Sequence, residues 1–146
     1  MWADSLLLAE RAHLLRLAAW GAASVVAGTI VLLVLAARRV RSPLLTHFAI
    51  QTAAWGTIDL ALVLMGWRSL AIRDAEAAAR LDRFLWFNTG LDVGYVAVGV
   101  ALAICGWTLG RRLGLVGAGV GVVVQGLALA LLDLWFASVL SRIAIA

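Results

Sequence analysis

The sequence predicts an all-α fold, namely a polytopic membrane protein built as a bundle of four transmembrane helices. Of its 146 residues, 64% are hydrophobic, whereas soluble domains are only about 45–50% apolar. The apolar residues gather in four runs, each long enough to cross a bilayer, which takes about 20 residues. The connections leave no room for a soluble domain, so residues 1–146 are expected to form a single transmembrane domain.

The first two spans are joined by a very short connection. We expect the first helix over residues 13–37, after an amphipathic lead-in over residues 4–12, and the second helix over residues 43–67. Pro43 fixes the start of the second helix, because proline fits a first helical turn, where its missing N–H is not needed. The N-terminus lacks the basic region of a signal peptide, so we expect the first helix to be retained.

The last two spans follow a polar connection. Residues 68–83 combine charged side chains with a run of alanines, which favours a helix outside the bilayer. We expect the third helix over residues 84–109 and the fourth over residues 113–140. Glycines spaced as GxxxG allow close packing within the bundle or between copies; they are Gly90 with Gly94, Gly106 with Gly110, and Gly117 with Gly121.

Arginines set the expected orientation and partners. The two short turns hold five arginines and no acid, so the positive-inside rule places them in the cytoplasm and both termini outside, in a bacterial inner membrane. The N-terminus, the long connection and the C-terminal tail together hold seven arginines and five acids. A simple count of arginines would therefore favour the opposite orientation. Since the arginines sit at the ends of apolar runs, the lipid bilayer and not nucleic acid is the expected partner of this basic chain.

Three of the four spans carry an aspartate at membrane depth. Residues three or four apart share a helix face, so each aspartate extends a polar stripe of its helix, and we expect these stripes to face inward together. Arg16 lies at the same end of the first helix, where it could pair with a carboxylate or reach the headgroups. The predicted polar cluster, for ligand binding or for structure, consists of Gln51, Trp55, Asp59, Asn88, Asp92, Tyr95, Gln125, Asp133 and Arg16.

Two segments match each other. Residues 51–60 and 125–134 both read glutamine, seven residues, aspartate and leucine. This pattern indicates a tandem duplication of a helical hairpin about an axis along the membrane normal. The first and third helices match poorly, so a chance match is the alternative.

Other site chemistries find little support. Cys105 is the single cysteine, which excludes an intrachain disulfide and a CxxC pair. No metal-ligand spacing and no serine–histidine–acid set occurs, so we predict no catalytic residue and no metal site. His13 and His47 fall at opposite ends of their helices, so they cannot ligate one haem iron together. No cofactor is predicted.

Three segments resemble an uncharacterised bacterial family of four-helix integral membrane proteins, known only as a domain of unknown function. They are His47-x3-Gln51-x3-Trp55-Gly56-x2-Asp59, Asn88-x-Gly90-Leu91-Asp92-x2-Tyr95 and Gln125-Gly126-x6-Asp133. The resemblance covers the second, third and fourth helices. The resemblance implies the four-helix fold and indicates that the polar stripes belong together, but it implies no activity.

Two functions agree with these features. The one that we expect is a non-catalytic membrane subunit or assembly partner, in which the polar cluster organises the bundle; its partner is another membrane protein or a second copy. The alternative is a small carrier or channel that binds a proton, a cation or a small polar solute at the cluster.

Overall fold

In the computed structural model, which describes residues 2–145, four helices occupy nearly the whole chain. Each helix is long and apolar enough to cross a membrane, so the predicted all-α bundle of four transmembrane helices is confirmed. The second helix begins at Pro43, with Ser42 as its N-cap. The helices are α1 (Trp2–Ala37), α2 (Pro43–Arg68), α3 (Ala75–Thr108) and α4 (Leu113–Ile145).

Three helices are longer than the sequence analysis predicts. The lead-in over residues 4–12 and most of the connection over residues 68–83 are the first turns of α1 and α3, continuous with the spans. Asp74 starts α3, because its carboxylate accepts a hydrogen bond of 2.8 Å from the backbone N–H of Ala77, and the alanines that follow have a high helix propensity. At the other terminus α4 continues beyond Leu140.

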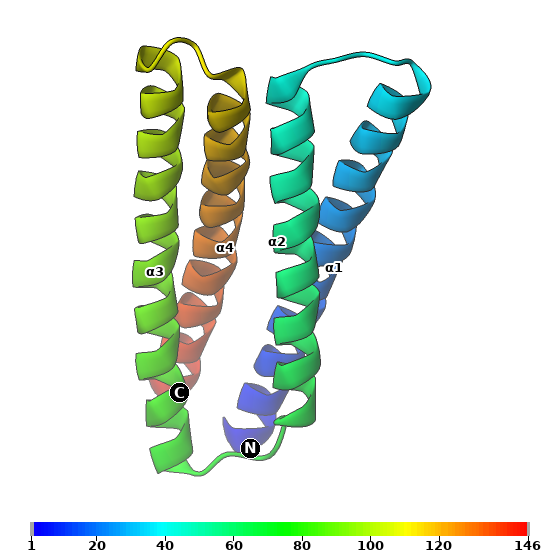
Figure 1. The fold of residues 1–146 in the computed structure, drawn as a ribbon. Coiled ribbons are helices and arrows are strands. Elements are labelled where there is room, and N and C mark those ends of the chain that lie inside the picture. The colour runs from blue at the N-terminus through cyan, green and yellow to red at the C-terminus, as the bar shows by residue number, and fades with distance from the viewer. Residues whose placement is uncertain (1, 146) are drawn as a thin grey trace.

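The helices form two hairpins that stand side by side (Figure 1). The short α1–α2 and α3–α4 turns lie at one end of the bundle, which we call the turn end; both termini and the α2–α3 connection lie at the opposite, terminal end. Among the described residues, α4 is the only helix whose backbone lies close to the backbones of all three other helices. This central position makes α4 the element against which the polar faces of the other helices can meet.

Glycines bring the backbone of α4 into contact with α2. A Cβ atom added to Gly117 would lie 2.0 Å from the carbonyl oxygen of Leu44, and one added to Gly121 would lie 2.8 Å from Cβ of Gln51. This predicted GxxxG pair therefore packs inside the bundle. A Cβ atom on Gly90 or Gly94 of α3 would meet nothing within 4 Å, so this GxxxG pair faces away from the other helices.

The terminal end is held by an apolar cluster and an ion pair. Arg73 of the α2–α3 connection places Nε 2.8 Å from Oε1 of Glu10 on α1, and Glu10 is only 5% exposed. This contact ties the connection to α1 beside the cluster. The apolar cluster joins α1, α3 and α4 and consists of Leu6, Leu85, Phe136, Ala137 and Leu140.

Candidate functional site

The centre of the candidate site is a hydrogen-bonded chain of three side chains from three helices. Trp20 of α1 donates from Nε1 to Oε1 of Gln125 on α4 at 2.9 Å. Gln125 in turn donates from Nε2 to Oδ2 of Asp59 on α2 at 3.1 Å. Asp59 and Gln125 are 0% and 1% exposed. The glutamine amide therefore joins α1 to α2 through the central helix, out of contact with lipid.

Small residues on α1 and α2 make room for Asp59. A Cβ atom on Gly21 would lie 3.0 Å from the carbonyl oxygen of Gly56 and 3.1 Å from Cβ of Asp59. The two backbones thus cross closely at this depth, and Ser24 is buried in the same crossing. The carboxyl group of Asp59 lies in the interior because the helices approach each other at glycines.

Asp92 of α3 is the second buried acid of the site. It is 4% exposed, and its backbone carbonyl oxygen would lie 2.9 Å from a Cβ atom on Gly126, so α3 packs tightly on α4 here. Asp59 and Asp92 contact neighbouring residues of α4, Gln125 and Gly126 respectively. Asp59 Oδ1 and Asp92 Oδ2 are buried and accept no hydrogen bond from any described residue. Two helices thus each present an unpaired carboxyl oxygen in the interior.

Asp133 of α4 lies nearer the terminal end. Its Oδ1 is 3.6 Å from Nε2 of His13 on α1, and the two side chains are 13% and 12% exposed. The imidazole stacks on the ring of Phe136, with centroids 4.6 Å apart. Along α4, Asp133 lies two helical turns, about 10 Å, beyond Gly126, the residue that packs on Asp92. Asp59, Asp92 and Asp133, which we call the carboxyl row, therefore lead from the middle of the bundle toward its terminal end.

The remaining predicted stripe residues lie around this row. The rings of Trp55 and Tyr95 meet edge-on across α2 and α3, with centroids 4.9 Å apart. Gln51 is half-buried opposite Gly121, on the turn-end side of the row, and Asn88 is half-buried on α3. The structure thus brings Asp59, Gln125 and Asp92 into the interior and leaves these four side chains at its margin.

Arg16 does not pair with an aspartate. Its guanidinium lies over the ring of Trp135, 5.5 Å from the centroid, because a tryptophan one helix away offers a cation–π contact at the exposed edge of α1 and α4. Both residues line a groove of about 650 Å³ between these helices, together with Trp20. The indole of Trp20 therefore separates this groove from Gln125.

The sequence analysis did not assign Trp20 or His13 to the cluster. Trp55 was the tryptophan expected in the cluster, but Trp20 is the tryptophan that donates to the buried glutamine. Its depth was the available signal, since a tryptophan far from both helix ends needs a partner for its indole N–H. His13 and His47 lie at opposite ends of the bundle: His47 contacts Pro43 and Gly114 at the turn end, whereas His13 meets Asp133.

Comparison with known proteins gives one match. A family of unknown function, DUF6992, matches the chain over residues 16–134. This segment contains the carboxyl row, Trp20 and Gln125, whereas Glu10 and His13 precede it. The predicted resemblance to an uncharacterised domain is confirmed. No curated protein and no solved structure matches the chain.

Proposed function

Since the chain belongs to the DUF6992 family, whose function is unknown, we propose a function from its own residues: it is an integral membrane protein that takes up protons on the carboxyl row. The observation that carries this proposal is the pair of buried, unpaired oxygens, Asp59 Oδ1 and Asp92 Oδ2. Buried polar atoms in folded proteins are almost always paired. An acid inside a membrane span must be paired or neutralised, and it marks a proton or ion pathway by default.

The donor set favours a proton over a metal ion. Calcium and magnesium are held by six or more oxygen atoms. Among residues 2–145, no group of three or more His, Cys, Asp or Glu side chains is placed to hold a metal ion. The amide oxygen of Gln125 is already engaged by Trp20. A proton needs only one carboxyl oxygen, and Asp59 and Asp92 each offer one that is buried and unpaired.

Protons reach the row from the terminal end in this proposal. Asp133 and His13 are the most exposed of its ionisable groups, and their 3.6 Å separation needs only a small movement to become a hydrogen bond. On the turn-end side, the backbones of α2 and α4 are in contact at Gly117. The arginine-rich turns point to a cytoplasmic turn end, so the row of a bacterial inner-membrane protein would take up protons from outside.

Infrared difference spectroscopy of the full chain in lipid vesicles tests this proposal. A pH jump applied to the wild type is expected to produce the carbonyl band of a protonated carboxyl group. Asp92→Asn and Asp59→Asn each remove part of that band. The matched control is Asp82→Asn, which makes the same change in the first turns of the same helix α3 and leaves the band intact.

Proton uptake from the medium, followed with a pH-sensitive dye outside the vesicles, provides the second readout. We expect proton uptake by the wild type and the control, and uptake that is slower by about a hundredfold or more in Asp92→Asn, since a positioned proton-transfer group contributes about 10²–10⁴-fold. A band that persists in both Asp59→Asn and Asp92→Asn would refute uptake on the row. An equal loss in Asp82→Asn would assign the signal to surface acids.

The exposed glycine pair of α3 favours a second candidate function, assembly with another membrane helix. Gly90 and Gly94 are open to the surroundings of the bundle, and small residues at this spacing let transmembrane helices approach closely. Gly94→Leu is then expected to abolish cross-linked dimers or a co-purified partner, and to leave the infrared band unchanged. Cross-linking that is unaffected by Gly94→Leu would exclude this face as the interface.

A further inference from the structure

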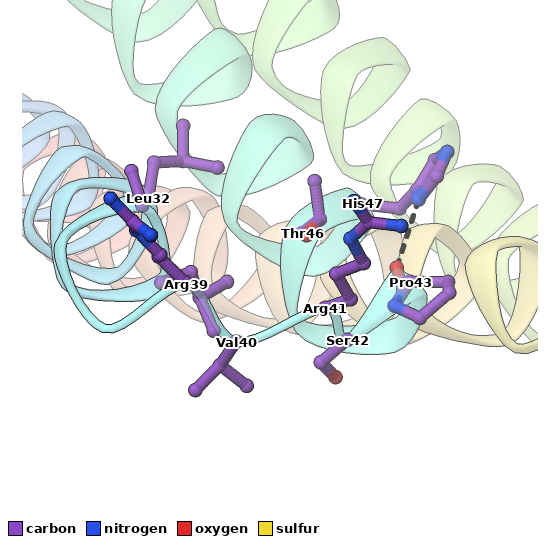
Figure 2. A pocket seen from close by; sticks show the side chains of 10 residues that line it. Leu32, Arg39, Val40, Arg41, Ser42, Pro43, Thr46 and His47 are labelled. Carbon is purple, nitrogen blue, oxygen red and sulfur yellow. Dashed lines mark hydrogen bonds between the residues drawn. The ribbon is translucent and has the colours of Figure 1, made fainter.

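A second feature lies far from the carboxyl row, where α1 turns into α2. A hollow of about 640 Å³ opens between the end of α1 and the start of α2 (Figure 2). Its lining is part apolar and part cationic, which no packing role explains. The residues that line it include Leu32, Leu35, Arg39, Val40, Arg41 and Thr46.

The backbone of the turn places the cationic side chains. Arg39 has φ 52°, the left-handed position that glycine usually takes after a helix. Its N–H donates to Ala36 and the N–H of Val40 donates to Leu35, so α1 ends in a Schellman motif. Figure 2 shows Arg39 and Arg41 extending from the turn back along the helices on the two sides of Thr46, whereas Val40 points the other way.

The two guanidinium groups are free to bind an anion. Among the described residues, neither Arg39 nor Arg41 forms an ion pair with a carboxylate. The start of α2 adds little, because Ser42 Oγ accepts from the backbone N–H of Leu45 at 3.3 Å and Pro43 has no N–H. Positive charge in this hollow therefore comes from the arginines.

The other turn has the same kind of charge but a different geometry. Arg111 also adopts a left-handed conformation, with φ 53°, yet its guanidinium lies over the ring of Trp107, 5.0 Å from the centroid. The guanidinium of Arg111 is therefore already engaged by an aromatic side chain of the protein. Among its described residues, the α3–α4 turn leaves Arg112 alone without such a contact, whereas Arg39 and Arg41 both line the hollow at the α1–α2 turn.

We propose that the hollow at the α1–α2 turn binds one anionic phospholipid, whose phosphate sits between Arg39 and Arg41 and whose acyl chain lies along Leu32 and Leu35. Guanidinium groups bind phosphate oxygens with bidentate geometry. Leucines beside them suit an acyl chain, which a free phosphate lacks. The location at the end of two membrane-spanning helices is where a headgroup meets the hydrocarbon. The site is independent of the carboxyl row.

Lipid titration of the full chain in neutral detergent, followed by native mass spectrometry, tests the proposal. The probe is phosphatidylglycerol, with phosphatidylcholine of the same acyl chains as reference and glycerol phosphate as a competitor without acyl chains. The wild type is expected to retain one phosphatidylglycerol. Arg39→Gln/Arg41→Gln is expected to bind it about thirtyfold more weakly, since each arginine near a lipid phosphate contributes about fivefold.

Arg38→Gln is the matched control, because it removes one charge from the same turn without lining the hollow. It should retain the lipid. Weakening of about fivefold by Arg38→Gln, which is the share of one arginine in the double variant, equal affinity for phosphatidylcholine, or full displacement by glycerol phosphate would overturn the site. If the double variant does not fold, a photoactivatable phosphatidylglycerol is cross-linked to the wild type. Labels within residues 32–47 support the site, and labels confined to other segments refute it.

Discussion

At the scale of single residues, Gln125 is the junction of the interior hydrogen bonds. Gln125→Leu would leave the indole N–H of Trp20 and Oδ2 of Asp59 without partners. We expect the free energy of unfolding to fall by about 1–3 kcal/mol, the cost of leaving buried polar groups unsatisfied. Denaturation in mixed micelles, followed by circular dichroism, measures this change.

Gln51→Leu is the control for this prediction, since Gln51 holds the matching position in the repeated segment but is only half-buried on α2. Its replacement should change the unfolding free energy by less than about 0.6 kcal/mol, the average value of a hydrogen bond between membrane helices. An equal or larger effect of Gln51→Leu would show that the hydrogen-bonded chain does not determine the stability of the interior.

The ion pair at the terminal end gives a second prediction at residue scale. Arg73→Gln leaves the buried carboxylate of Glu10 without its partner, which costs about 3–5 kcal/mol for a buried pair. Glu10→Gln is expected to cost less, because Arg73 is 25% exposed and water can solvate it. The double variant should be more stable than Arg73→Gln alone. A double-mutant cycle of melting curves checks this order, and additive effects would contradict it.

At the scale of the helix, glycine determines how closely α4 approaches α2. Gly117→Ala places a methyl group 2.0 Å from the carbonyl oxygen of Leu44, so the helices must separate, at a cost of about 1–3 kcal/mol. Gly94→Ala makes the same change where nothing lies within 4 Å, and it should stabilise α3 by about 0.5–1 kcal/mol. Thermal unfolding of both variants measures the contrast. Equal destabilisation would contradict the packing explanation, and stabilisation of both variants would show that helix propensity alone decides the outcome.

The number of helices and the start of α2 could be predicted from the sequence, because apolar length and the position of Pro43 are local properties. The true starts of α1 and α3 could not be predicted in this way. Their first turns are polar, and the pattern does not reveal whether a polar helix continues into a span. Contacts distant in sequence, such as Arg73 with Glu10, support these turns in the folded chain.

At the scale of the whole molecule, the two hairpins decide which polar side chains meet. The repeated segments align Gln51 with Gln125, but Gln51 packs opposite Gly121, one helical turn before Gln125. The matched glutamines therefore lie at different depths in the bundle. Gln125 donates to Asp59 of the other repeat, and among the described residues no hydrogen bond between Gln51 and Asp133 mirrors this contact. The stripes predicted which faces turn inward, whereas the pairing depends on relative depth and rotation of helices, which no local pattern contains.

The same architecture makes the orientation in the membrane testable. Ser69 and Arg112 are exposed at opposite ends of the bundle, and Cys105 is the single cysteine. In a Cys105→Ser background, we expect a membrane-impermeant maleimide to label Ser69→Cys on intact cells. Arg112→Cys should react only after lysis, because arginine-rich turns stay in the cytoplasm.

The result also decides the direction of the proposed proton uptake. The carboxyl row is least buried at Asp133, beside His13 at the terminal end, and the close contact at Gly117 separates it from the turn end. Labelling of Ser69→Cys alone would give the row access to the outside. Labelling of Arg112→Cys alone would leave the row and its infrared band unchanged but reverse the access, so that Asp92 would take up protons from the cytoplasm.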